Sequence, residues 1–333
     1  MTGKRSDGTI LHQRVQQPWP HDKPFKILSI DGGGIKGILP AIILREIERE
    51  LCNGAPITSY FDLISGTSTG GILAVGLAAR KTAQELFDLY CNPELGGKIF
   101  RRSKNPMLSI WGTMHDRAPL DTMILETLGH RKFGESAVRL VVPAVNQHGE
   151  PTMYKTDHHL DYKRDHSETM ARVALDTSAA PIYLGGNITG EEVCVDGGLF
   201  MNNPIMGAVV DALSCYDVSR TKVEVLSLGC GRLTKEINVK KASGGLLSWR
   251  DTVEYVSQLQ SHNALGQAGL LISRQNIVRL DPELSTPIAM DDFKESLSRL
   301  PELGATTYRR EKEKIKPFFN ETVSPRERHY HPV

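Results

Sequence analysis

A serine that could act as a nucleophile lies in the motif Gly66-x-Ser68-x-Gly70. An apolar segment typical of a strand precedes this motif, and an apolar segment typical of a buried helix follows it. In this setting the two glycines permit a sharp turn that exposes the serine hydroxyl at the edge of a sheet. The pattern therefore predicts a nucleophilic serine, and a purely structural tight turn is the alternative.

A serine hydroxyl is a weak nucleophile unless a neighbouring base accepts its proton. Histidine is the usual base, and the chain contains 11 of them. None has a setting that distinguishes it, because those considered lie in polar segments or near the end of the chain: His158, His159, His166, His329 and His331. We expect these histidines to be surface residues rather than catalytic ones.

Asp196 has a better setting for a base than any histidine. It directly follows a short predicted strand over residues 193–195 and precedes two glycines. The carboxyl ends of strands are where α/β proteins build their sites. A carboxylate that is hydrogen-bonded to Ser68 there could accept the serine proton directly, whereas an ordinary Asp-Gly turn is the alternative.

Three consecutive glycines, Gly32, Gly33 and Gly34, follow the first predicted strand and precede a helix. Glycines at such a junction leave backbone N–H groups uncovered, which suits a phosphate or a transient oxyanion. With Ser68 as nucleophile, this loop and the N–H of Thr69 would form an oxyanion hole, each donor contributing about 3–4 kcal/mol. Lys36 would add positive charge nearby.

The same loop also matches a dinucleotide-binding fingerprint, Gly32-x-Gly34-x-x-Gly37. That fingerprint expects an acidic residue about twenty positions further on, at the end of a second strand. The acidic residues in range, Glu48 and Glu50, fall on the predicted helix, and Asp31 would place a carboxylate beside the pyrophosphate. A nicotinamide- or flavin-dependent enzyme is therefore the weaker alternative.

The elements that must position these groups alternate along the chain. Apolar runs predict strands over residues 26–30, 61–65, 138–145, 193–195 and 223–229, and helical patterns lie between and after them. Alternation of this kind predicts an α/β fold with a central, mostly parallel sheet flanked by helices. We expect an irregular arm over 1–24 and a single domain over 25–333, with its motifs within 25–230 and a helix-rich part over 245–320.

Composition excludes several function classes. A net charge of +1 over 333 residues gives no basic footprint for a nucleic-acid polymer. The longest apolar stretch, residues 71–79, is too short to span a membrane, and the N-terminus shows no signal peptide. Five cysteines without a CxxC motif argue against a disulfide framework and against a zinc site. We therefore expect a cytoplasmic protein that needs no metal and no cofactor.

Three motifs together resemble the patatin-like phospholipase family: Asp31-Gly-Gly-Gly-Ile-Lys-Gly37, Gly66-Thr-Ser68-Thr-Gly70 and Asp196-Gly197-Gly198. The likeness covers roughly residues 25–230. It implies a patatin-like fold and hydrolysis of lipid acyl esters by a Ser–Asp dyad without histidine. By motif position it makes Ser68 the nucleophile, Asp196 the base and the three glycines the oxyanion loop. Lys36 stands where many members have arginine, so it keeps the charge but loses the bidentate fork.

Within this family the chain resembles the phospholipase effectors of cyclic-oligonucleotide anti-phage (CBASS) systems. That resemblance implies a cyclic dinucleotide activator such as cyclic GMP-AMP, and membrane phospholipid as the substrate at the inner membrane surface. It is also compatible with a ligand-dependent homo-oligomer. An alternative is a cyclic-nucleotide receptor that acts by assembly and keeps only a vestigial site.

Two further regions are candidates for these partners. Residues 98–111 mix cations with large apolar side chains, as a membrane-docking face would, although a partly buried helix explains them equally well. A cyclic dinucleotide site needs cations for phosphates and flat groups for bases. The sequence does not choose among the candidates for that site: Trp249, Arg250, Tyr255, Tyr308, Arg309 and Arg310.

Overall fold

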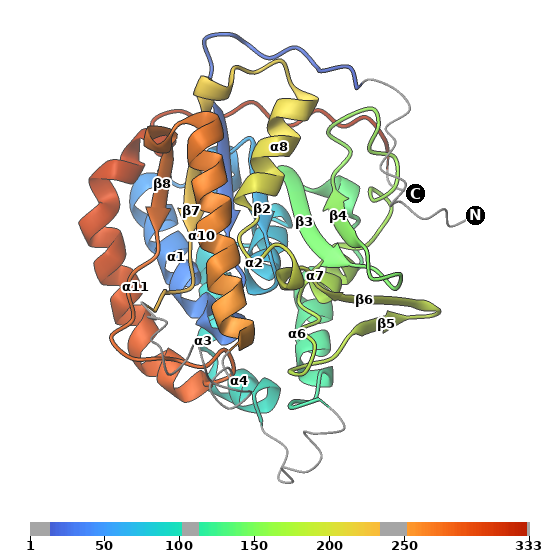
Figure 1. Ribbon diagram of the computed structural model, residues 1–333, viewed down its shortest axis with the longest axis vertical. Helices are drawn as coiled ribbons and strands as arrows, with labels where there is room; N and C mark the ends of the chain where they lie inside the picture. Colours follow the sequence, from blue (N-terminus) through green and yellow to red (C-terminus); the bar gives the residue numbers. More distant parts are fainter. Residues whose placement is uncertain (1–13, 102–112, 234–251, 332–333) are drawn as a thin grey trace, which may run out of the picture.

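The computed structural model describes residues 14–101, 113–233 and 252–331, and Figure 1 shows it as a ribbon. Within these residues one eight-stranded sheet has the order β5-β6-β3-β2-β1-β7-β8, with β4 paired to β3. The strands are β1 (Phe25–Ile30), β2 (Leu63–Gly66), β3 (Arg139–Val145), β4 (Pro151–Lys155), β5 (Asn187–Thr189), β6 (Glu192–Asp196), β7 (Val223–Leu228) and β8 (Ile277–Leu280).

The centre of the sheet is parallel, as the sequence predicted. β1 lies between β2 and β7 and pairs in parallel with both. The pair of β2 and β3 and the pair of β7 and β8 are parallel as well. The remaining pairs, β3 with β4, β3 with β6 and β5 with β6, are antiparallel. The sequence did not predict β4, β5 or β8, because short strands of mixed polarity lack the apolar run that marks a buried parallel strand.

Helices cover both faces of the sheet, which confirms the predicted α/β class (Figure 1). α8 and α10 pack on one face with one hydrophobic cluster, and α1, α2, α3, α7 and α11 belong to the cluster on the other face. The helices are α1 (Ile38–Leu51), α2 (Thr69–Ala78), α3 (Ala83–Cys91), α4 (Pro93–Ile99), α6 (Ala118–Leu128), α7 (Met170–Thr177), α8 (Ile205–Cys215), α10 (Thr252–Ile272) and α11 (Phe293–Ile315).

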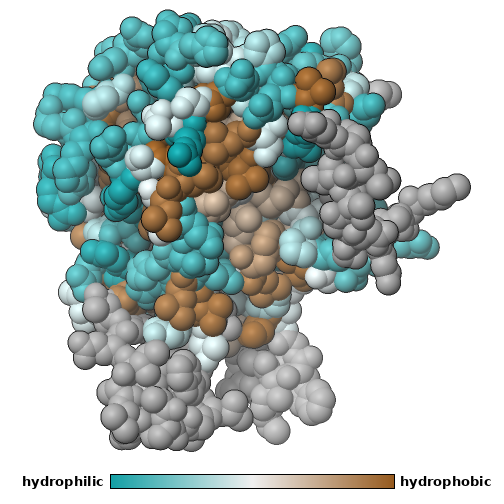
Figure 2. All heavy atoms as spheres, turned by 45° about the horizontal axis from the view of Figure 1, so that its top comes forward, coloured by the Kyte–Doolittle hydropathy of each residue, from teal (hydrophilic) through white to brown (hydrophobic). Residues whose placement is uncertain are grey.

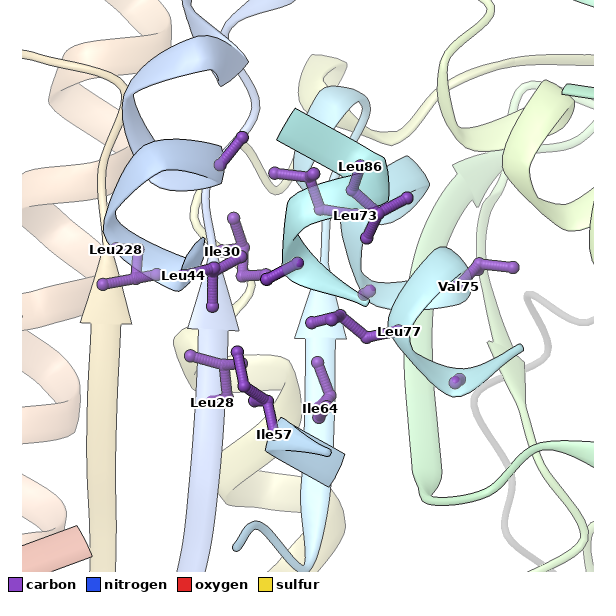
Figure 3. Close-up of a cluster of buried hydrophobic side chains, with 14 of the residues drawn as sticks. Leu28, Ile30, Leu44, Ile57, Ile64, Leu73, Val75, Leu77, Leu86 and Leu228 are labelled. Carbon is purple, nitrogen blue, oxygen red and sulfur yellow. The ribbon is translucent and has the colours of Figure 1, made fainter. Parts of the chain in front are cut away.

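β1 shows why its sequence reads as one continuous apolar run. Ile27 belongs to the cluster beneath α8 and α10, whereas Leu28 and Ile30 belong to the cluster on the opposite face. Successive side chains of a strand point to opposite faces, so a strand covered on both sides must be apolar throughout. Figure 3 shows Leu28 and Ile30 among side chains from α1, α2 and α3, such as Leu44, on one of these faces.

The chain after α11 runs back across the amino ends of the strands and is fixed there by Arg326. The buried guanidinium of Arg326 forms an ion pair of 2.7 Å with the carboxylate of Asp157 and donates to the carbonyls of Ser136 and Gly134. The backbone N–H of Tyr330 donates to the same carboxylate at 2.9 Å. This segment is therefore part of the packed fold rather than a loose tail.

Replacing Arg326 with methionine should lower the free energy of unfolding by about 3–5 kcal/mol, because the Asp157 carboxylate would remain buried without its cation. Urea unfolding of the full chain measures this change. Arg328→Met is the matched control, since Arg328 is exposed and makes a single 3.3 Å bond to the Glu135 carbonyl. We expect that control to change stability by no more than about 0.5 kcal/mol. Equal effects of the two substitutions would contradict a fixing role for Arg326.

Candidate active site

Ser68 lies at a strained turn between β2 and α2. Its backbone angles are φ 54° and ψ −122°, a left-handed conformation that a residue with a side chain rarely adopts. A Cβ on Gly66 would collide with the Gly70 carbonyl, and one on Gly70 would collide with the Ile30 carbonyl. Strand and helix can therefore meet this closely only because glycines flank the serine. Strain of this kind is typical of a nucleophile elbow.

Thr177, at the end of α7, fixes this turn to the neighbouring strand. Its hydroxyl accepts the N–H of Ser68 at 3.1 Å and donates to the carbonyl of Pro143 in β3 at 2.6 Å. The Ser68 N–H is therefore already used and is not available to an oxyanion. No sequence signal pointed to Thr177, because the contact depends on how α7 packs against α2.

Asp196 reaches the serine from the last residue of β6. That strand runs antiparallel to β3, with Asp196 paired to Ala144, so its end returns to the carboxyl edge of the parallel strands. The Asp196 side chain is hydrogen-bonded to Ser68, and its Oδ1 accepts the N–H of Gly198 at 2.7 Å. Burial raises the pKa of Asp196 to about 6, although the hydrogen bonds from Ser68 and Gly198 oppose the rise. A carboxylate with this pKa can accept a proton near neutral pH.

The glycine loop offers fewer donors than the sequence suggested. The N–H of Gly32 donates to the Asn202 carbonyl at 2.9 Å, so Gly32 holds the loop in place and cannot serve an oxyanion. Within the described residues, the N–H groups of Gly33, Gly34 and Thr69 have no acceptor. These three residues line the same cavity as Ser68 and Asp196. Gly34 has φ +59°, and a Cβ there would collide with the Met290 carbonyl.

Lys36 does not line this cavity, although the sequence analysis expected it to add positive charge near the oxyanion. Its ammonium forms a 2.9 Å ion pair with Glu254 of α10, and the residue lines a smaller cavity of about 50 Å³ that Gly32 and Gly33 also line. The reason is that α10, distant in sequence, supplies a carboxylate with which the Lys36 ammonium pairs. Lys36 therefore ties the loop to α10.

Asp31, directly before the glycines, is held by an arginine that the sequence analysis missed. Arg279 of β8 donates to both of its carboxylate oxygens, at 2.8 and 2.7 Å, and the hydroxyl of Ser261 donates at 3.1 Å. Arg279 also contacts Asp281 at 3.0 Å. Burial raises the pKa of Asp31, and Arg279 opposes that rise. The pair fixes the start of the glycine loop to β8, and no sequence signal links residues 248 positions apart.

The cavity above the dyad is apolar. It encloses about 180 Å³, and no lysine, arginine or histidine of the described chain lines it. Ile182 and Leu199 line it and also reach the surface, with 56% and 53% of their area exposed. The lining of the site therefore suits an acyl chain better than a charged molecule. Figure 2, which turns the top of Figure 1 forward, shows hydrophobic residues in the middle of the visible face, with hydrophilic residues around them.

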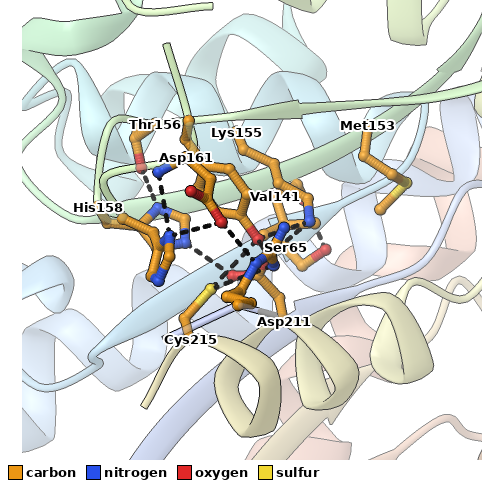
Figure 4. Close-up of polar contacts among 12 residues, drawn as sticks. Ser65, Val141, Met153, Lys155, Thr156, His158, Asp161, Asp211 and Cys215 are labelled. Atoms are coloured by element: carbon orange, nitrogen blue, oxygen red, sulfur yellow. Dashed lines mark hydrogen bonds and ion pairs between the residues drawn. The ribbon is translucent and has the colours of Figure 1, made fainter. Parts of the chain in front are cut away.

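His158 belongs to a separate polar cluster on the α8 side of the sheet (Figure 4). Its Nε2 lies 2.7 Å from Asp211, which also contacts Lys155 at 2.7 Å, and Cys215 completes a set with metal-ligand spacing. The hydroxyl of Tyr162 donates to Asp211 at 2.6 Å. Because the Lys155 ammonium and two further partners already occupy the carboxylate, we interpret the cluster as a closed hydrogen-bond network rather than a metal site.

The four described residues among those proposed from sequence for a cyclic dinucleotide do not form one site. Tyr308 is buried against α1 with its hydroxyl on Glu50, and Arg309 and Arg310 form exposed ion pairs on α11. Tyr255 lies half-buried on α10. Trp249, Arg250 and most of the proposed docking face over 98–111 lie outside the described residues. In the part of the chain that is described, no helix is both long and apolar enough to cross a bilayer.

Comparison with known proteins places this geometry in context. The model of a family described as patatin-like phospholipase matches residues 28–209. A relative from Pseudomonas aeruginosa is 41% identical over 54% of this chain, and one from Escherichia coli is 37% identical over 62%. A relative from Vibrio cholerae is 33% identical over 84% of this chain. All three are named cGAMP-activated phospholipase. The matches span 54%, 63% and 89% of these relatives' own lengths.

Proposed function

The chain belongs to the patatin-like phospholipase family, and we propose that it cleaves acyl esters of phospholipids through a Ser68–Asp196 dyad. The observation that carries this proposal is the buried Asp196 carboxylate, which is hydrogen-bonded to Ser68 and has a pKa raised to about 6. The glycine loop lines the same apolar cavity as both residues. Nucleophile, base and oxyanion donors are thus available together.

In the acylation step, Oγ of Ser68 attacks the ester carbonyl carbon while the Asp196 carboxylate accepts the hydroxyl proton. The carbonyl oxygen becomes an oxyanion and accepts hydrogen bonds from the N–H groups of Gly33, Gly34 and Thr69. When the tetrahedral intermediate collapses, the C–O bond to the leaving alkoxide breaks. Protonated Asp196 returns its proton to that alkoxide, which leaves as a lysophospholipid.

Deacylation repeats the same two chemical steps with water as the nucleophile. Asp196 accepts a proton from the water as its oxygen attacks the acyl carbon, and the same N–H groups stabilise the second oxyanion. Collapse releases the free fatty acid, and the proton held by Asp196 returns to Oγ of Ser68. The apolar lining of the cavity would hold the acyl chain throughout.

We further propose that a cyclic dinucleotide such as cyclic GMP-AMP activates this hydrolysis. The support is the name cGAMP-activated phospholipase, which the three bacterial relatives share. The roles at the inner membrane surface and in anti-phage defence, and a ligand-dependent homo-oligomer, stay predictions. The hydrogen bond between Ser68 and Asp196 favours a working dyad over a vestigial site, and family membership disfavours a dinucleotide-cofactor enzyme.

Release of fatty acid from vesicles of phosphatidylethanolamine and phosphatidylglycerol tests the proposal. We expect release by the wild-type chain at pH 8, and at least a tenfold increase when cyclic GMP-AMP is added. If fatty acid release does not respond to any cyclic dinucleotide, the proposed phospholipase activity stands and the proposed activation is contradicted. An absence of release with every nucleotide, from these vesicles and from a soluble short-chain ester, would contradict the hydrolase itself.

A further inference from the structure

A second cavity, of about 360 Å³, lies at the end of the sheet opposite the Ser68 site. Its walls include Lys26 at the start of β1, Asp62 just before β2 and Arg139 at the start of β3. The segments 17–24 and 321–329 complete it, and they lie side by side because Gln17 contacts His329 at 2.8 Å. We call it the amino-end cavity, since it lies at the amino ends of β1, β2 and β3. These strand ends are near the top of Figure 1.

Arg139 gives the amino-end cavity a fixed cation. The side chain is buried, and its guanidinium lies over the rings of Trp19 and Tyr216 at 5.7 and 5.1 Å. Nε donates to the Tyr216 hydroxyl at 2.8 Å, and Nη1 donates to the Asp62 carbonyl at 3.2 Å. Within the described residues, Nη2 has no acceptor. A positioned guanidinium with a spare donor is the group that best recognises a phosphate.

Flat rings and further charges surround this cation. Trp19 is half-buried, and its indole lines the cavity beside Tyr216, with ring centroids 5.3 Å apart. Lys23 is exposed at the rim, whereas the Lys26 ammonium is held by the carbonyls of Phe318 and Glu321 at 3.0 and 3.2 Å. Aromatic faces suit purine rings, and cations suit the phosphates between them.

Carboxylates also face the amino-end cavity, from Asp62, Glu321 and Glu327. Burial raises the pKa of Asp62 to about 6, although the N–H of Lys26 and the charge of Arg139 oppose the rise. Carboxylates accept hydrogen bonds from the N–H edge of guanine or from the amino group of adenine. The mixture of cations, carboxylates and rings therefore matches a nucleotide better than a simple anion such as phosphate or sulfate.

We propose that the amino-end cavity binds the activating cyclic dinucleotide, an inference that rests on the proposed function. The catalytic cavity is unsuited to this ligand, because it is apolar and no lysine or arginine of the described chain lines it. The residues suggested from sequence in the last third of the chain do not share a cavity in the described part. The amino-end cavity instead combines rings, a buried arginine and base-binding carboxylates.

The sheet connects this cavity to the dyad. β1 begins at the cavity and ends directly before Asp31 and the glycine loop, and β2 begins next to Asp62 and ends two residues before Ser68. A strand rises about 3.3 Å per residue, so six residues of β1 separate the two sites by roughly 20 Å. A ligand that orders the amino ends of these strands acts on the segments that carry both the nucleophile and the oxyanion donors.

Titration calorimetry of the full chain with cyclic GMP-AMP tests the assignment. Lys23→Glu places a negative charge beside the phosphates, and Trp19→Leu keeps apolar packing but removes the flat ring. We expect each substitution to raise Kd about tenfold or more, the usual consequence of losing a stacked base or a phosphate contact. Lys294→Glu is the matched control, because it reverses an exposed charge on α11, outside this cavity, and should leave Kd within about twofold.

A second measurement follows the fluorescence of Trp19, which lines the amino-end cavity. It detects binding directly and does not require a variant that has lost binding. The chain has three tryptophans, so Trp111→Phe with Trp249→Phe leaves Trp19 as the sole indole emitter. We expect cyclic GMP-AMP to quench this emission saturably, with the same Kd as calorimetry gives. Thermal unfolding of each variant verifies that it is folded.

The outcomes separate this inference from the proposed function. If wild type binds cyclic GMP-AMP and releases more fatty acid, but both cavity variants behave like Lys294→Glu, the activated phospholipase stands and this cavity is not the site. Binding of AMP or GMP as tightly as cyclic GMP-AMP would overturn the assignment to a cyclic dinucleotide. If wild type binds no cyclic dinucleotide, both the activation and the site are overturned, while hydrolysis is judged separately.

Discussion

Replacing Ser68 with alanine is expected to lower kcat for phospholipid hydrolysis by at least about 10⁴-fold. Without Oγ no acyl-enzyme can form, and the oxyanion donors then act only on direct attack by water. Stability should change little, because alanine fits the space of serine and the strained φ of 54° is set by the backbone around it. Fatty acid release from activated enzyme, corrected for spontaneous hydrolysis, measures the effect.

Ser178→Ala is the matched control for this substitution. Ser178 lines the same cavity, but its hydroxyl donates to the Ala174 carbonyl at 2.7 Å and has no part in the dyad. We expect its kcat to stay within a few-fold of wild type. Substantial hydrolysis by Ser68→Ala, or an equal loss in Ser178→Ala, would mean that Ser68 is not the nucleophile.

Replacing Asp196 with asparagine is expected to lower kcat by about 10³- to 10⁴-fold, because an amide cannot accept the proton of Ser68. The amide oxygen can still accept the N–H of Gly198, so the turn after β6 should persist. A fluorophosphonate probe, which reports on an activated serine, should label this variant much more slowly than wild type. Labelling at the wild-type rate would show that another group is the base.

The pH profile gives an independent test of the same residue. Because burial raises the pKa of Asp196 to about 6, kcat/KM of wild type should fall about tenfold for each pH unit below that value. The residual activity of Asp196→Asn should lack this step. A wild-type profile that stays flat down to pH 4.5 would contradict a carboxylate base with the raised pKa.

Stability should change with pH in the opposite direction from activity. The pKa of Asp196 is higher in the folded protein than the 3.8 of an unperturbed aspartate, so the folded state binds this proton more tightly. Its contribution to stability is therefore greatest at low pH and declines as pH rises from about 4 to about 6. At pH 8 the buried charge opposes folding, and Asp196→Asn should unfold at or above the wild-type temperature.

The elements nearest in sequence to the dyad were predictable because their signals are local. β1, β2 and α2 each form from one apolar segment, and the glycines around Ser68 mark a strand-to-helix turn that only residues without a Cβ permit. The α/β class with a mostly parallel sheet followed from the same alternation and is confirmed. The direction of β6 was not predictable, because five residues with one buried apolar side chain carry no signal for a pairing partner.

By itself, then, the sequence determined the class of fold and which residues could act as nucleophile, base and oxyanion loop, since those properties depend on side-chain type and on neighbours a few positions away. Only the tertiary structure decided which of them meet. The tertiary structure brings Asp196 to Ser68, and it lets the Gly32 N–H donate to the Asn202 carbonyl. It also pairs Lys36 with Glu254 and Asp31 with Arg279. Each buried donor or charge takes the nearest partner that the packed chain supplies, and that partner comes from an element remote in sequence.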